Sequence, residues 1–122
     1  MTGGEQIRAA LTAGLGTMAG SRVRQDMADE RDELPFIIFR RFGYKYETGL
    51  LGPPMAMQEV MHIECWADTR AQTDAMEAQV VAALLAANLF PLGGDTDGTD
   101  ADVKVRAGTI MVDVWTLYPV AE

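Results

Sequence analysis

The 122-residue sequence contains one cysteine and one histidine, and both shortages exclude kinds of protein. A single cysteine cannot form an internal disulfide, so the chain is not a small secreted fold held together by disulfides. It also supplies too few thiolates for a zinc finger or an iron–sulfur centre. One histidine without a second histidine or cysteine is a poor site for a transition metal. We therefore expect neither a metal nor a cofactor.

The chain also lacks a long apolar run and has few basic residues. No stretch approaches the roughly eighteen apolar residues of a membrane-spanning helix, and the N-terminus has no basic or apolar region of a secretion signal. We therefore expect no membrane association and synthesis in the cytoplasm. Ten Lys and Arg against eighteen Asp and Glu give a net charge of −8. This charge disfavours binding to the phosphate backbone of nucleic acids.

What the sequence does have is enough apolar material for one core, because 48% of its residues are hydrophobic. Hydrophobic periodicity predicts two helices, over residues 5–18 and 70–88, and three strands, over residues 36–42, 58–67 and 109–118. Residues 21–34 are polar and are interpreted as a solvated connection. This order predicts a single α+β domain over residues 1–122. We expect a two-layer sandwich, with two helices packed on one face of a small, mostly antiparallel sheet.

Two segments are predicted to be irregular. Residues 43–57 hold three glycines and a Pro-Pro pair, which oppose a regular element, and we interpret them as a long loop or hairpin. Residues 93–102 are interpreted as an acidic, turn-rich loop. They do not fit a calcium-binding loop, because the twelfth position, Arg106, is basic. Gly108, between this loop and the last strand, predicts a bend or bulge.

Few residues are candidates for catalysis. Cys65 and His62 are three residues apart, so on a strand they point to opposite faces and cannot form a nucleophile–base pair. His62 and Glu64 share a face, and Asp113 is placed to reach them from an adjoining strand. These three residues leave open a small enzyme or a ligand-binding domain. The interpretation that we favour is a polar pair on an open or interfacial sheet face.

The predicted sheet has a second face that no helix clearly covers. That face carries two tryptophans and several aliphatic residues, and large exposed apolar patches mark interaction surfaces. The alternative is that the long loop or the first helix folds across it. A cluster of basic and aromatic residues around Arg40 fits nucleic acid or, as we favour, an acidic loop of another subunit. The interface candidates are Trp66, Trp115, Met111, Leu117, Arg40, Arg41, Lys45, Leu50, Leu51, Met55 and Met57.

Five stretches, in order along nearly the whole chain, resemble a known family. They are Ile7–Leu11, Leu34–Phe39, Glu59–Ala67, Asp68–Ala71 and Ile110–Trp115. The sequence is similar to the tail terminator or tail-completion proteins of long-tailed bacteriophages and of phage-derived gene transfer agents. The acidic loop after residue 91 is longer than in the pattern of that family, and the resemblance includes no catalytic signature.

The resemblance implies a structural, non-enzymatic role in the virion, at the tail–neck junction. Such proteins form a ring, usually of six subunits, that ends polymerisation of the tail tube and offers the head a docking surface. The implied partners are further copies of the chain, the major tail tube protein and a head–neck connector protein. DNA passes through the lumen without specific binding, and an acidic lumen suits this because it repels DNA. Another neck component, a head-closure or adaptor protein, is the close alternative.

Overall fold

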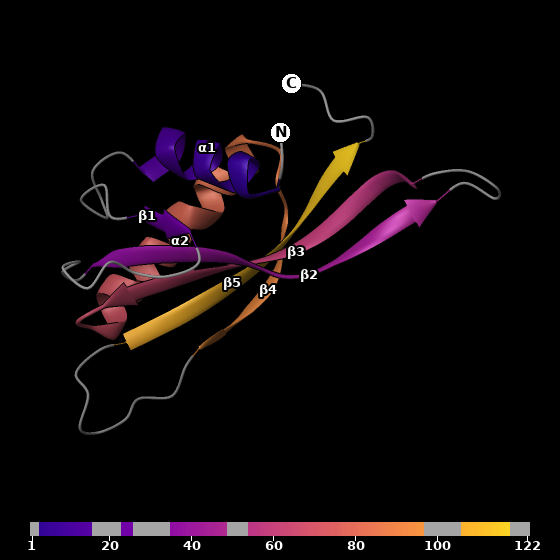
Figure 1. Ribbon diagram of the computed structural model, residues 1–122. Helices are drawn as coiled ribbons and strands as arrows, with labels where there is room; N and C mark the ends of the chain where they lie inside the picture. The colour runs from indigo at the N-terminus through magenta and orange to yellow at the C-terminus, as the bar shows by residue number, and fades with distance from the viewer. Residues whose placement is uncertain (1–2, 16–22, 26–34, 49–53, 97–105, 118–122) are drawn as a thin grey trace.

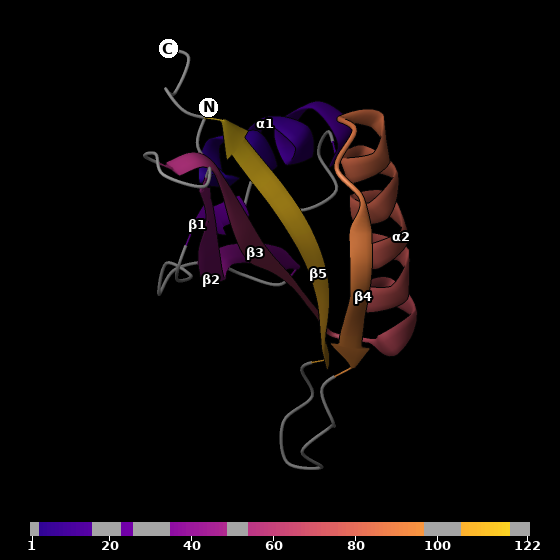
Figure 2. The same cartoon turned by 90° about the vertical axis from the view of Figure 1, so that its right-hand side faces the viewer.

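A computed structural model of the chain describes residues 3–15, 23–25, 35–48, 54–96 and 106–117. These residues form two helices and five strands: α1 (Gly3–Leu15), β1 (Val23–Gln25), β2 (Phe36–Thr48), β3 (Pro54–Ala67), α2 (Arg70–Ala86), β4 (Pro91–Thr96) and β5 (Arg106–Leu117). The sheet has the order β1-β2-β3-β5-β4, and only the short β1 pairs in parallel. Both helices lie on one side of it (Figure 1 and Figure 2). The predicted α+β arrangement is therefore confirmed.

The hydrophobic core lies between the two helices and the face of the sheet that they cover. Alternate residues of β3, Met61, Ile63 and Cys65, point into this core and are at most 1% exposed. This alternation is the two-residue period of a strand with one covered face. The rest of the chain supplies the remaining large core residues, Ile7, Leu11, Ile37, Phe39, Met76, Val80, Leu84, Leu89, Ile110, Val112 and Val114.

Helix α2 begins and ends at signals that are local in the sequence. The Thr69 side chain accepts a hydrogen bond from the backbone N–H of Gln72 at 3.1 Å, which satisfies one of the free donors of the first turn. At the other end, the N–H of Leu89 donates to the carbonyl of Leu84 at 2.8 Å. Asn88 has a φ of 60°, a left-handed conformation that ends helices and that asparagine tolerates. The helix therefore ends two residues before the predicted residue 88.

Helix α1 begins at a signal that is distant in the sequence. The N–H of Gly3 donates to Oε1 of Glu59, in the middle of β3, at 3.0 Å. A Cβ atom on residue 3 would lie 2.6 Å from that oxygen, so a larger residue there would displace the Glu59 carboxylate. The helix starts two residues before the predicted residue 5, because this tertiary contact fixes its first turn, and Leu15 is its last described residue.

Of the loop or hairpin expected over residues 43–57, the described residues form paired antiparallel strands, so only the expectation that Gly and Pro oppose a regular element is wrong. Gly43–Thr48 continues β2 and Pro54–Met57 begins β3, paired from Gly43 with Val60 to Thr48 with Pro54. The two strands form an arm that extends past the helices (Figure 1). Cross-strand hydrogen bonds override the weak strand preference of Gly and Pro, and the ladder adapts by register shifts after Arg41 and after Glu47.

Three smaller expectations also need correction. Gly93–Thr96 belong to β4 rather than to a loop, while residues 97–102 lie outside the described residues. Gly108 lies in unbroken register with Cys65, so it marks no bulge. A Cβ there would collide with the Glu77 carboxylate, so glycine lets α2 pack closely on β5. The polar connection at 21–34 contains β1, which pairs with Ile37–Phe39 of β2.

Candidate functional site

The face of the sheet away from the helices carries polar and aromatic side chains that are only partly covered. Here Arg40 of β2 lies opposite His62 of β3, which in turn lies opposite Met111 of β5. Trp66 is also on this face, where its ring stacks on Phe36 with centroids 6.0 Å apart. Met111 and Trp66 are both half-buried. Residues predicted to be available for a partner are thus partly used within the subunit.

The three candidates for catalysis on this face, His62, Glu64 and Asp113, each contact different neighbouring side chains. Glu64 accepts hydrogen bonds from Arg40 Nη2 at 2.5 Å and from Trp66 Nε1 at 3.3 Å. The His62 ring stacks almost parallel on Phe42, with centroids 4.5 Å apart. Asp113 Oδ2 accepts from Gln58 Nε2 at 2.6 Å. Within the described part of the chain, no hydrogen bond or ion pair joins these three residues into a catalytic unit.

Cys65 and His62 lie on opposite faces of β3, as their three-residue separation predicted, and Cys65 is buried in the core. Burial, and then the negative charge of Glu77, raise the pKa of its thiol to about 12. The group therefore stays a neutral thiol, and only the thiolate is a good nucleophile or metal ligand. Among the described residues, no group of three or more His, Cys, Asp or Glu side chains is arranged to hold a metal ion.

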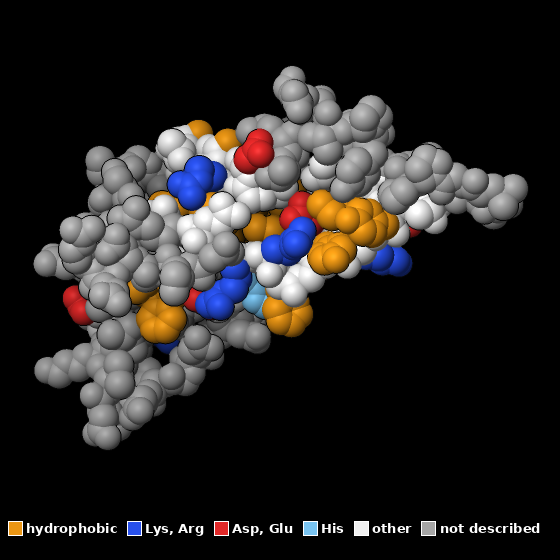
Figure 3. Space-filling view, in the orientation of Figure 1, with side chains coloured by type: hydrophobic (Ala, Val, Ile, Leu, Met, Phe, Trp, Pro, Cys, Tyr) orange, Lys and Arg blue, Asp and Glu red, His pale blue; other side chains and the backbone are white. Residues whose placement is uncertain are grey.

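The outer edge of β2 concentrates basic and aromatic side chains. Arg41 lies over the Tyr44 ring at 4.5 Å, and Tyr44 meets Tyr46 edge-on at 5.6 Å. Phe42, at the register shift, is 74% exposed, and Lys45 is equally exposed. Figure 3 shows basic and hydrophobic side chains gathered together over this strand. We call this surface the basic-aromatic edge: Arg40, Arg41, Phe42, Tyr44, Lys45 and Tyr46.

Arg41 connects the basic-aromatic edge to β3 and α1 through Glu59. Its Nη1 lies 3.6 Å from Oε2 of Glu59, the same carboxylate whose other oxygen accepts from the first turn of α1. The Glu59 side chain is only 6% exposed, and a buried carboxylate needs such partners. Glu59 therefore joins β2, β3 and α1 at one point, below the arm.

A second exposed apolar surface lies around β4. Phe90 and Leu92 are 63% and 62% exposed, and Trp115 of β5 is 47% exposed. Leu92 separates two hollows. The first is lined in part by Asp74 and Glu77 of α2, and the second, of about 420 Å³, by Phe90, Asp113 and Trp115. We call this surface the acidic-apolar edge: Asp74, Glu77, Phe90, Leu92, Asp113 and Trp115.

Asp74 and Glu77 both line the first hollow, and the charge of Asp74 affects the pKa of Glu77. The pKa of Glu77 is raised by partial burial and then by the charge of Asp74, while Arg70 lowers it. Arg70 reaches only to within 3.9 Å of Asp74, and both side chains remain partly exposed. An ion pair of this kind contributes little, so the hollow keeps its negative character.

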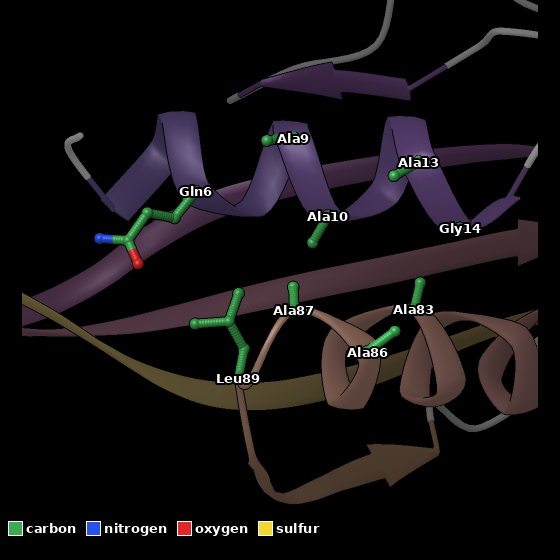
Figure 4. A pocket seen from close by; sticks show the side chains of 9 residues that line it. All are labelled: Gln6, Ala9, Ala10, Ala13, Gly14, Ala83, Ala86, Ala87 and Leu89. Atoms are coloured by element: carbon green, nitrogen blue, oxygen red, sulfur yellow. The ribbon is translucent and has the colours of Figure 1, made fainter.

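A third hollow, of about 330 Å³, lies between α1 and α2 (Figure 4). Its lining consists of Gln6, Leu89 and small residues: Ala9, Ala10, Ala13, Gly14, Ala83, Ala86 and Ala87. A side chain at Gly14 would collide with Ala83, so small residues allow the helices to approach closely. Among the side chains that line this groove, the amide of Gln6 is the one polar group.

The structure places the predicted interface residues in several settings. Trp115 and the basic residues Arg40, Arg41 and Lys45 are exposed, whereas Met57 is buried, at 8%. Met55 and Leu117 lie in β3 and β5, and Leu50 and Leu51 lie outside the described residues. Sequence reasoning missed Phe90 and Leu92. The Phe-Pro-Leu run after α2 is the signal that could have drawn attention to them, but we interpreted it only as a helix end.

Fold and surfaces together define a small α+β protein whose two exposed edges have the side chains of protein-contact surfaces. Residues 5–117 match the family described as tail completion protein gp17. The chain therefore belongs to this family of bacteriophage tail proteins, and the resemblance to tail-completion proteins is confirmed. No curated protein gave a match. Among the described residues, no helix is long and apolar enough to cross a membrane.

Proposed function

We propose that the protein is a tail terminator of the virion. In this role, copies of the chain form a ring at the head-proximal end of the tail tube, at the tail–neck junction. The ring ends tube polymerisation and gives the head a surface to join. The observation that carries the proposal is the match of residues 5–117, nearly the whole chain, to a tail-completion family.

The chemistry of the subunit supports association with other proteins. Its exposed aromatic and aliphatic side chains lie in two groups, and aromatic residues with arginine are enriched where proteins meet. Catalysis finds no support in the contacts of His62, Glu64 and Asp113, since Glu64 and Asp113 accept hydrogen bonds from other residues and the His62 ring stacks on Phe42. A structural role therefore fits the described residues better than an enzymatic one.

The partners in this proposal are other copies of the chain, the major tail tube protein and a head–neck connector protein. Six subunits is the number that the resemblance implies. Each chain adds a net charge of −8 to the ring. Because like charges repel, an acidic ring allows DNA to pass through its lumen without retaining it.

Tube assembly in vitro tests the proposal. Purified tail tube protein is polymerised with and without the chain, and tube lengths are measured by electron microscopy. We expect shorter tubes with the chain bound at one end, and capped tubes that join heads. Light scattering should show an oligomer of six copies of the 13.3-kDa chain, free or on the tube. Tubes that elongate equally in both samples, with no chain at their ends, would contradict the proposal.

A further inference from the structure

The sheet narrows from five strands to three beyond one level. β1 pairs with β2 only at Ile37–Phe39, and β4 pairs with β5 no further along than Val112. Past this level the register joins Gly43–Glu47 of β2, Ala56–Val60 of β3 and Asp113–Leu117 of β5. We call this part of the sheet the three-stranded ribbon. Its outer strands are β2 and β5, and among the described residues no strand pairs with the outer edge of either.

The outer edge of β5 directs backbone hydrogen-bonding groups away from the sheet. The carbonyl of Trp115 accepts a hydrogen bond from Nε2 of Gln6, on α1, at 3.1 Å. A side chain thus takes a place that a neighbouring strand would occupy. Because backbone groups alternate between the two sides of a strand, every second residue from Asp113 to Leu117 directs its N–H and C=O away from β3.

The same alternation locates the outward groups of β2. Trp115 lies opposite Gln58, which lies opposite Lys45. Since the backbone groups of Trp115 point away from β3, those of Gln58 point toward β2 and pair with Lys45. Tyr44, the neighbour of Lys45, therefore directs its N–H and C=O to the outer edge. Outward groups of this kind are the sites where another strand can add to a sheet.

Each edge of the ribbon also has an exposed aromatic side chain on the face away from the helices. Phe42, stacked on His62, is 74% exposed at the β2 edge, and Trp115 is 47% exposed at the β5 edge. Beside Trp115, where β4 no longer accompanies β5, lies the hollow of about 420 Å³ that Phe90 and Leu92 also line. Within one subunit β3 separates Phe42 from Trp115, so these two rings cannot cover each other.

We infer that the β2 edge of the ribbon in one copy adds to the β5 edge of the ribbon in the next copy. β2 and β5 are both antiparallel to β3, so they run in the same direction. Copies related by a rotation about an axis along the ribbon can therefore pair β2 with β5 in parallel, as β1 already pairs on the same edge of β2. The uncovered face then continues from copy to copy and brings Phe42 beside Trp115 of the next copy, where both rings become buried.

A second copy is the occupant that accounts for both edges at once. A strand of an unrelated protein would cover one edge and leave the other open, and open edges promote unwanted association. Two-fold contact through one edge would join two copies and also leave the other edge open. Head-to-tail pairing uses both edges of every copy and closes into a ring when the rotation allows it. This inference rests on the proposed ring and specifies its interface.

Cysteine cross-linking tests which edges meet. Lys45→Cys and Trp115→Cys place thiols on the uncovered face of the two outer strands, and Phe42→Cys provides a second position on β2. Positions two strands apart in one subunit are separated by about 10 Å, beyond the limit of about 7 Å between the Cα atoms of a disulfide. The chain's own Cys65 is fully buried and does not compete. Thr12→Cys, on an exposed position of α1, is the matched control.

Linked species are separated on non-reducing gels after mild oxidation. We expect a mixture of Trp115→Cys with Lys45→Cys or with Phe42→Cys to form linked dimers, and each single variant alone to stay unlinked. A chain with cysteines on both edges should form a ladder of linked copies that ends at the full ring. Linked dimers of one single variant would indicate a two-fold contact and overturn the pairing. Equal linking with Thr12→Cys would reflect random collision and would also overturn it.

A proline tests whether the backbone takes part. Tyr44→Pro removes an outward N–H, which a strand tolerates at an edge, so circular dichroism should remain that of the unaltered chain. Tyr44→Ala removes the same side chain and keeps the N–H. We expect Tyr44→Pro to be monomeric by light scattering and Tyr44→Ala to associate more strongly. Equal association of the two folded variants would contradict strand pairing.

The remaining outcomes separate this inference from the proposed function. If the unaltered chain forms the ring but neither cysteine mixture is linked, the pairing is wrong and the ring proposal stands. If Tyr44→Pro forms the ring but no longer binds tail tubes, the β2 edge contacts the tube instead, and the pairing is again wrong. If the unaltered chain stays monomeric both free and with tail tubes, the ring proposal and the pairing both fail.

Discussion

The covered face of the sheet and its uncovered edges use the same strands for different purposes. In β5, Val112 and Val114 are fully buried against the helices, while the next residue, Trp115, is 47% exposed. In β2, Phe39 is fully buried and Phe42 is 74% exposed. Burial of apolar side chains on the covered face stabilises the folded subunit. Large apolar side chains that are exposed on the edges become buried only when the subunit associates with another protein. Substitutions on the two sides should therefore affect different properties.

The largest effect on folding is expected at the centre of the covered face. Leu84→Asp puts an unpaired charge on a fully buried position of α2. It should lower the free energy of unfolding by at least about 3 kcal/mol, or prevent folding. Denaturant unfolding measures the loss. Leu85→Asp is the matched control, since the neighbouring side chain is 47% exposed and should cost far less. A loss below about 1 kcal/mol for Leu84→Asp would mean that α2 is rotated.

A smaller loss in the free energy of unfolding is expected at Glu59, where the covered face meets the arm formed by β2 and β3. Glu59→Ala removes the acceptor of the Gly3 N–H and the partner of Arg41. It should cost about 1–2 kcal/mol in chemical unfolding, as does the loss of a helix cap. Glu59→Gln keeps an acceptor and should cost less. Equal losses in the two variants would show that the charge on Glu59, rather than the cap, stabilises the subunit.

On an uncovered edge, substitution should change assembly more than folding. Trp115→Glu adds a charge to the acidic-apolar edge, where the side chain is 47% exposed. We expect weaker self-association by light scattering and an unchanged helical circular dichroism signal. Trp115→Tyr keeps an aromatic ring and should assemble nearly as well as the unaltered chain. Loss of the folded monomer in Trp115→Glu would instead assign Trp115 to the core of the subunit.

The smallest effect is expected at Glu77, between the covered face and the acidic hollow. Its pKa is raised in the folded state, mainly by burial, so the folded chain binds the proton more tightly than the unfolded chain. Ionisation therefore opposes folding at neutral pH, and this cost disappears below the ordinary pKa of 4.5. Glu77→Gln should slightly raise the melting temperature at neutral pH and lose this advantage below pH 4.5. An equal gain at both pH values would contradict the assignment.

The sequence by itself predicted the features that depend on residues close together along the chain. The alternation along residues 58–67 predicted which side chains of β3 are buried, because a strand repeats every two residues. The start of α2 at residue 70 was also predicted, since the cap that Thr69 forms needs only the next few residues. The cluster of Arg40, Arg41 and Lys45 with aromatic residues was likewise visible, and the structure places it on an exposed edge.

Tertiary structure decided what depends on residues far apart in the chain. Pairing across the sheet made strands of Gly43–Thr48 and Pro54–Met57, against their local composition. Glu59 fixes the start of α1 from 56 residues away, through a contact that no local pattern encodes. The acidic-apolar edge arises only when Asp74 and Glu77 of α2 lie beside Leu92 of β4, and Asp113 and Trp115 of β5 lie on its other side. Local periodicity fixes which face of an element is apolar, but only packing decides which of those faces remain uncovered.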